Sequence, residues 1–223
     1  MVIPASTITL GELSLFAKRQ FGDESGVQIT DVDIARWVNM GCIEIVSKNK
    51  ILQATASVMG TVNIGGYDLS TIALDMIAIE DVSYGGKSLE QSDNSGIKKL
   101  LGTSAAESGV PMYWYTWANQ IKLWPVPTTA ELLSIDYIKV PPKVSGAGDL
   151  LPLPDVYYER IVNFVLAKAY ELDEDSTSSA NQRRLFEDKL TEMTGLDESR
   201  AGTFPVVRDD FEGGYYLGNE DGW

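Results

Sequence analysis

The side chains of this chain that could carry acid–base chemistry are carboxylates, because the sequence has 32 acidic residues and no histidine. Without histidine the chain lacks the commonest general base, the commonest zinc ligand and every catalytic triad that needs an imidazole. Adjacent carboxylates such as Asp209–Asp210 could still exchange protons with a substrate. They lie in a glycine-rich tail that offers no fixed geometry, so we expect no catalytic residues.

The densest acidic run, from Glu171 to Asp175, could bind a hard cation such as calcium. An EF-hand loop that starts at Asp173 needs glycine at its sixth position and a bidentate glutamate at its twelfth. Those positions hold Ser178 and Arg184, so the pattern fails. We interpret the run as a solvated helix end and expect no metal ligands.

The cysteine and the glycine motifs of the sequence also predict no catalytic or cofactor site. The single cysteine, Cys42, lies in the apolar pattern WVNMGCIEIV, with nothing nearby to lower the pKa of its thiol, so we expect a buried structural thiol. Phosphate-binding loops of the forms GxxxxGK[ST] and GxGxxG are missing, as is the GxSxG elbow of hydrolases. Isolated glycine pairs, such as Gly85–Gly86, are explained as turns, and we expect no cofactor.

Aromatic residues gather in the stretch PMYWYTWANQIKLWPVP, residues 111–127. Such a run could be a platform on which nucleic-acid bases stack, but platforms of this kind come with basic residues that follow the backbone. Only Lys122 lies nearby, so core and interface packing is favoured. The aromatic residues concerned are Tyr113, Trp114, Tyr115, Trp117 and Trp124.

The charge balance argues against tight binding to nucleic acid. The 18 basic residues leave a net charge of −14, and no run of lysine or arginine is longer than two. A protein that neutralises phosphates needs a basic face. The acidity fits either a surface that repels DNA or ordinary solubility. The sequence also shows no apolar run long enough to span a membrane and no secretory signal pattern, so we expect neither a transmembrane helix nor a secretory signal.

Helical periodicity dominates the first part of the chain. Residues 9–20 form a short amphipathic pattern that FGDESG, residues 21–26, interrupts. Thr30 or Asp31 can cap a second helix, in which apolar residues recur every three or four positions. This pattern predicts a helix that continues to about Val58, with a break or bend near residues 48–50.

Strand patterns follow from residue 60. TVNIGGYDL and the run from Met76 to Val82 predict two strands joined by a turn, and SYGGKSLEQSD predicts a hairpin at Gly85–Gly86. The segment 97–109 is a short helix or a loop. Further strands are predicted at 112–118, 120–124 and 132–139, with a tight turn at Ala118–Asn119 joining the first two.

Helices return after a proline-rich connection. Pro154-Asp155 predicts a helix start with the aspartate as cap, and a last helix is expected over about 180–194, ended by Gly195. The fold class is therefore α+β. The N- and C-terminal helices pack as one bundle, with an inserted antiparallel β subdomain and an extended C-terminal arm. The expected boundaries are residues 1–59, 60–149, 150–198 and 199–223.

The last segment, residues 199–223, combines five glycines with spaced aromatic rings and shows no period. It is either an extended arm whose rings bind in pockets of a partner, or a tail folded over its own core. We favour the arm. Its expected partner-binding residues are Phe204, Phe211, Tyr215, Tyr216 and Trp223.

The order of these elements resembles a known family. A helix pair and a β segment precede PMYW, IKLWPVP, IDY and VPP, after which LPLPDVYYERIV opens the main helix and RRLFEDKLTEM follows a polar turn. This order is similar to that of the head-to-tail adaptor (connector or tail tubular) proteins of tailed bacteriophages, most of all those of short-tailed phages. The resemblance covers roughly residues 30–195 and is most specific in 111–193.

The resemblance implies a structural virion protein and not an enzyme. It implies a ring of identical subunits, with twelve copies expected, that docks under the portal protein, extends the DNA channel and presents a face to the tail nozzle or another tail protein. DNA would pass without specific binding, the site of action would be the head–tail junction of the virion, and synthesis would occur in the host cytoplasm. Two alternatives stay open: a tail-associated hydrolase that uses carboxylates, and a packaging or nucleic-acid-binding factor.

Overall fold

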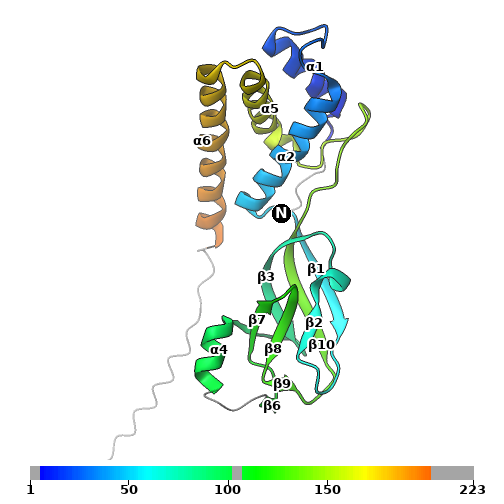
Figure 1. The fold of residues 1–223 in the computed structure, drawn as a ribbon, viewed down its shortest axis with the longest axis vertical. Coiled ribbons are helices and arrows are strands. Elements are labelled where there is room, and N and C mark those ends of the chain that lie inside the picture. The colour runs from blue at the N-terminus through cyan, green and yellow to red at the C-terminus, as the bar shows by residue number, and fades with distance from the viewer. Residues whose placement is uncertain (1–5, 102–106, 202–223) are drawn as a thin grey trace, which may run out of the picture.

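The computed structural model describes residues 6–101 and 107–201 of the chain. The helices α1, α2, α5 and α6 and the strands occupy separate parts of the molecule (Figure 1). The α1, α2, α5 and α6 helices form a bundle, and the strands form a β subdomain inserted in the chain between α2 and α5. The predicted α+β class with an inserted, mainly antiparallel subdomain is confirmed, whereas the predicted arm lies outside the described residues apart from its first three positions.

Side-chain caps fix where the first two helices begin. The α1 helix, Leu10–Phe21, starts after Thr9, which forms a capping box with Glu12. The α2 helix, Asp31–Asn49, starts after Thr30, which forms the same box with Asp33. Gly22 ends α1 in the left-handed conformation, with a φ of 91°. Of the two residues predicted to cap the second helix, Thr30 is therefore the cap.

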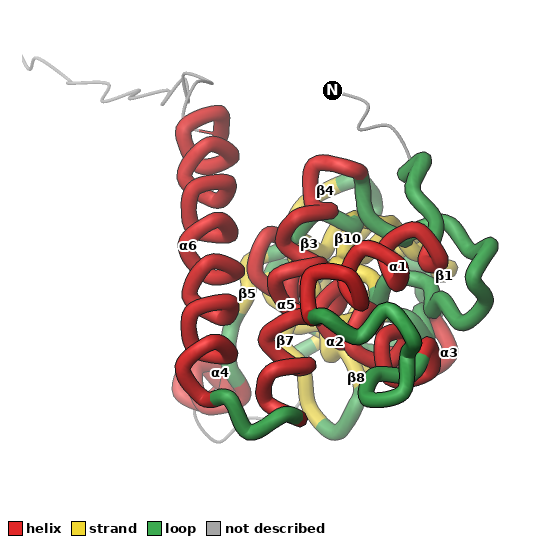
Figure 2. Tube along the Cα trace, turned by 90° about the horizontal axis from the view of Figure 1, so that it is seen from above, coloured by secondary structure: helices red, strands yellow, loops and turns green. Residues whose placement is uncertain are grey.

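The helical bundle is centred on α5, Tyr158–Leu172, which packs against α1, α2 and α6 (Figure 2). Its apolar face includes Ile161 and Val165, both with no exposed surface. The ring of Phe164 meets that of Phe186 edge-on, with the ring centres 5.3 Å apart. At Gly41 of α2 an added Cβ would lie 3.0 Å from the Phe164 ring, so a larger residue would push these two helices apart.

The β subdomain consists mainly of two four-stranded sheets. The first has the order β1-β10-β3-β4 and the second the order β2-β8-β7-β5. Buried side chains of both sheets, such as Val82 and Ile135 of the first and Trp114 and Ile121 of the second, share one core, so the sheets pack face to face. The strands of the first sheet are β1 Gln53–Met59, β10 Leu132–Lys139, β3 Met76–Tyr84 and β4 Lys87–Ser88. Those of the second are β2 Gly66–Asp68, β8 Gln120–Trp124, β7 Tyr113–Trp117 and β5 Glu90–Gln91.

Short elements complete the subdomain. The α3 helix, Leu69–Ile72, and the α4 helix, Asn94–Leu101, connect strands, and β6 Ser108–Gly109 pairs with β9 Val126–Pro127 in parallel. The sequence left residues 97–109 as either a short helix or a loop. Residues 97–101 are helical, since they form the end of α4. The turns predicted at Gly85–Gly86 and Ala118–Asn119 are confirmed, since all four residues have positive φ angles.

The strand β10 reaches both cores. Its pairing with β3 shifts at two places, which leaves Ile77 and Glu80 of β3 as extra residues. The adjacent residues Tyr137 and Ile138 of β10 point to opposite faces of the sheet and are both buried, the first in the β core and the second in the helical core. This strand therefore connects the two parts of the molecule.

Three expectations about helices are wrong. Residues 53–59 form strand β1 and do not continue α2, because Lys50 ends the helix with a φ of 53° and the following residues alternate between exposed and half-buried positions. Asp155 does not cap the main helix. A 3₁₀ turn, η1 (Asp155–Tyr157), precedes α5, and the Asp155 carboxylate instead accepts hydrogen bonds from Ser6 and Thr7.

The last helix is also longer than expected. The α6 helix spans Ser176–Ala201, so it runs through Gly195 instead of stopping there. A single glycine lowers helix stability by about 1 kcal/mol relative to alanine, which is too little to end a long helix by itself. The two strands expected over residues 60–84 likewise differ from a simple hairpin, because β2 and β3 belong to different sheets and α3 lies between them.

Candidate functional site

The residues predicted to bind partners lie outside the described part of the chain. They are Phe204, Phe211, Tyr215, Tyr216 and Trp223. Asp209–Asp210 lie outside it as well. The candidate site must therefore be built from the surfaces that the described residues present.

The aromatic run of residues 113–124 does not form one stacking platform, because its rings alternate between the two faces of a sheet. Trp114 is buried between the sheets, whereas Tyr113 packs against Trp124 with the ring centres 5.7 Å apart. Lys122 lies opposite Tyr115 in the register of β7 and β8. The interpretation of the run as packing residues is supported, except at Trp117, which is 59% exposed.

Trp117 borders an open groove of about 640 Å³ between the two sheets. Its lining combines the segment after β2, the first half of β3 and the end of β7. Leu74 and Ile77 contribute apolar surface, with exposed fractions of 89% and 36%. Of the residues that line this groove, the aromatic pattern of the sequence had singled out Trp114 and Trp117. The apolar run LDMIAIE could have indicated the groove, because it is more hydrophobic than a half-exposed strand requires.

The opposite, outward face of the first sheet is polar and carries no basic side chain on its two central rows. Four serines, one from each strand, lie side by side in register: Ser57, Ser134, Ser83 and Ser88. The next row holds Thr55, Asp136 and Asp81. The inward residues between them, Leu133, Ile135 and Val82, are buried in the β core.

Two carboxylates on this polar face lie directly opposite each other. Asp81 and Asp136 are register partners in β3 and β10, an arrangement in which like charges destabilise a sheet. Hydroxyl donors offset part of this cost, since Thr55 donates to Asp136 and Ser88 donates to Asp81 at 2.7 Å. The face is therefore lined by acceptors and hydroxyls and carries concentrated negative charge.

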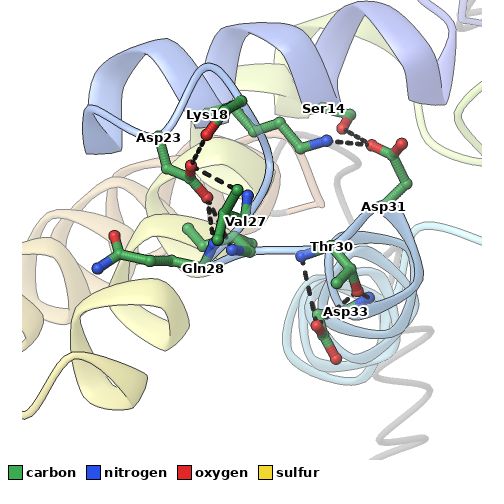
Figure 3. Close-up of polar contacts among 10 residues, drawn as sticks. Ser14, Lys18, Asp23, Val27, Gln28, Thr30, Asp31 and Asp33 are labelled. Atoms are coloured by element: carbon green, nitrogen blue, oxygen red, sulfur yellow. Dashed lines mark hydrogen bonds and ion pairs between the residues drawn. The ribbon is translucent and has the colours of Figure 1, made fainter.

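The α1–α2 connection is organised by a single carboxylate (Figure 3). Asp23 accepts hydrogen bonds from the backbone N–H groups of Val27, Gln28 and Ile29, at 3.1, 2.7 and 2.9 Å. These bonds, the one from Ile29 above all, lower the pKa of Asp23 to about 2, although its burial opposes the shift. Nearby, Asp31 accepts from Lys18 at 2.7 Å and from Ser14, which ties α2 to α1.

The residues that the sequence offered as reactive or metal-binding have structural roles in the fold. Cys42 is fully buried, and this burial raises the pKa of its thiol to about 12, so the prediction of a structural thiol is confirmed. In the acidic run, Glu171 pairs with Lys168, and Asp175 accepts from the backbone N–H of Ser178 at the start of α6.

Within the described residues, histidine, cysteine and carboxylate side chains form no group of three or more that could hold a metal ion. The helices of this part of the chain include none with the length and hydropathy needed to cross a membrane.

Comparison with known proteins identifies a family. A family model described as the SU10 adaptor protein matches residues 8–209, which covers both the helical bundle and the β subdomain. No curated protein matches the chain.

Proposed function

Because this chain belongs to the SU10 adaptor protein family, a family of phage head-to-tail adaptors, we propose that it forms a closed ring between the head and the tail of a phage. The match over residues 8–209 is the observation that carries the proposal. The structural role of a phage adaptor follows from the family. Beyond that role, we propose the closed ring, its partner proteins and the contacts between them.

In this proposal, the ring contains twelve copies, docks under the portal protein and offers its other face to the tail nozzle or another tail protein. The separation of the molecule into a helical bundle and a β subdomain supports it, since each part can serve a different neighbour (Figure 1). The rings of Phe204, Phe211, Tyr215, Tyr216 and Trp223 are the proposed anchors on a neighbouring copy or the portal.

DNA passes through the proposed ring without specific binding. The polar face of the first sheet supports this, because the pair Asp81 and Asp136 repels phosphate and the two central rows of the face hold no basic side chain to attract it. The net charge of −14 acts in the same direction. A channel wall with these properties would let DNA slide without pausing.

The proposal is tested by mixing the purified protein with its portal. We expect a monomer or weak oligomer in light scattering before mixing and a closed ring afterwards, which cryo-EM would image with its copy number. If no ring forms on the portal, the proposal is wrong. A stable ring without the portal would refute the coupling between docking and assembly, but not the adaptor role.

Family membership favours this function over a carboxylate-dependent hydrolase and over a packaging factor. The described carboxylates with lowered pKa values mostly hold turns and helix starts, as Asp23 and Asp149 do, and are not gathered for catalysis. An activity screen and a salt-dependent DNA titration distinguish these two alternatives from the adaptor.

A further inference from the structure

The first half of β3 is a free sheet edge among the described residues. On one side β3 pairs with β10 along its length, but on the other side β4 pairs only with Ser83 and Tyr84. Residues 76–81 therefore have no neighbouring strand there. A free edge presents backbone N–H and C=O groups that another extended chain can use.

The groove beside Trp117 runs along this free edge, and its lining mixes apolar and polar groups. Four consecutive residues of β3, Met76 to Ile79, line it, with a bulge at Ile77. Because Ala78 and Ile79, which follow the bulge, point to opposite faces of the strand, a groove that touches both must follow its edge. Its far wall is the end of β7 with Trp117, and Trp114 also lines it.

This edge has only part of the protection that usually keeps a sheet from pairing. Glu80 and Asp81 are charged and two bulges interrupt β3, at Ile77 and Glu80, whereas Met76–Ile79 contains no charged residue and no proline. The exposed side chains of Leu74 and Trp117 flank it, at 89% and 59% exposure. A free edge beside a groove with exposed apolar side chains matches the mode of recognition in which a peptide adds as a strand and places alternate side chains in pockets.

The chain itself contains a segment suited to this groove. Beyond Ala201, residues 202–223 can span up to about 75 Å when extended, more than twice the roughly 30 Å of the nine-residue strand β3. The α6 helix, which leads into this segment, ends on the side of the bundle that faces the β subdomain (Figure 1). The segment contains strand-favouring residues in two places, Val206–Val207 after Pro205 and the pair Tyr215–Tyr216.

We infer that the groove beside the free edge of β3 receives the C-terminal segment of a neighbouring copy, residues 202–223, as an added strand. The inference rests on the proposed ring, because self-assembly supplies the neighbouring copy. Backbone hydrogen bonds to β3 would link the copies, and tyrosine or phenylalanine rings of the segment would cover Leu74, Ile77 and Trp117.

Cysteine crosslinking tests the pairing in the full-length chain. One version carries Leu74→Cys, and a second version with a size tag carries Tyr216→Cys; the native Cys42 is buried and stays unreactive. Mixed on the portal and oxidised, the two versions should give a disulfide-linked pair of unequal chains. In the control, Val27→Cys replaces Leu74→Cys. Val27 lies in the α1–α2 connection and is 81% exposed, and this version should give no disulfide-linked pair.

The outcomes separate this inference from the ring itself. Rings that assemble without a crosslink overturn the pairing and leave the ring intact. In a third version that carries both Leu74→Cys and Tyr216→Cys, a crosslink that forms only within one chain shows that the segment folds onto its own subunit, which also overturns the pairing. A crosslinked pair of chains without rings supports the pairing and contradicts the closed ring.

Hydrogen exchange gives a second measurement that does not depend on engineered cysteines. The backbone amides in Ile77–Glu80 that point away from β10 should gain protection when the chain assembles, because the added strand pairs with them. Leu74→Lys should weaken assembly by roughly tenfold or more, since it places a charge in an apolar contact. Val27→Lys should leave assembly unchanged, and equal effects of the two lysines would overturn the inference.

Discussion

Single carboxylates of this protein hold loops and helix starts in place. Asp23 accepts three backbone N–H groups, Asp149 accepts those of Ser145 and Gly146, and Asp155 accepts that of Thr7. Hydrogen bonds to a carboxylate favour its charged form, and they lower the pKa of each of the three; at Asp155 the hydroxyls of Ser6 and Thr7 contribute more than the backbone. Part of the acidity of the chain therefore serves its folding.

Asp23→Asn should make the protein less stable at neutral pH and less sensitive to acid. The pKa of Asp23 is about 2 in the folded protein and 3.8 ordinarily. A lowered pKa stabilises the fold above the ordinary value, and this stabilisation is lost as the pH falls from about 4 to about 2. Thermal unfolding of both proteins across this window should show their difference shrinking as the pH falls.

Glu24→Gln is the matched control, since Glu24 is the exposed neighbour of Asp23. It should leave both the melting temperature and its pH dependence nearly unchanged. A constant difference between Asp23→Asn and the native protein from pH 7 to pH 2 would show that the carboxylate charge is not responsible.

Phe164→Ala should cost roughly 3–5 kcal/mol of unfolding free energy, because it leaves a cavity in the helical core. Phe164 is 2% exposed and packs against Phe186 and Gly41. Phe16→Ala, at a position that is 41% exposed, should cost much less. Denaturant unfolding measures both, and a loss below about 1 kcal/mol at Phe164 would contradict its role in the core.

Among the elements, α6 is held to the bundle by packing and by several polar contacts, among them Lys189–Glu159 and those of Arg183. Arg183 pairs with Glu44 of α2 and Glu187 of its own helix. Its guanidinium also lies over the rings of Phe164 and Phe186, 5.5 and 5.1 Å from their centres. One side chain thus connects α2, α5 and α6.

Arg183→Met should destabilise the protein by about 1 kcal/mol, because it removes partly exposed ion pairs and the contact of a cation with two rings. Arg184→Met changes the same residue type at the next, exposed position and should have almost no effect. Denaturant unfolding at low and high salt would compare the two. Equal effects would mean that the contacts of Arg183 do not hold α6.

For the whole molecule, charge sets the relation to DNA. The net charge of −14 and the serine and aspartate rows of the first sheet predict negligible DNA affinity at physiological salt. A fluorescence titration with duplex DNA should show no saturable signal. Micromolar binding that weakens steeply with salt would contradict this prediction.

Deletion of residues 202–223 should leave the melting temperature of the free protein nearly unchanged and abolish assembly on the portal. The expected reason is that this segment makes its contacts with a neighbour and not with its own core. Thermal unfolding and light scattering with the portal measure the two effects. Unfolding of the shortened protein would place the segment in the core, and normal assembly would make it dispensable.

The sequence by itself determined the class of fold, the positions of most elements and the family. Periodicity reports which face of a segment is apolar, and turn residues such as Ala118–Asn119 and caps such as Thr30 act over a few positions, so both can be read locally. The family motifs of residues 111–193 are likewise local. None of these signals depends on distant contacts.

The tertiary structure alone decided what depends on pairing between distant segments. Residues 53–59 are a strand because they pair with β10, about eighty positions later, which no local pattern reveals. The serine row, the opposed pair Asp81 and Asp136, and the free edge of β3 all follow from sheet register and from the short length of β4. Register is fixed by the burial of one face of the sheet across several strands. The surface that we propose for docking was therefore visible only after the strands had been placed.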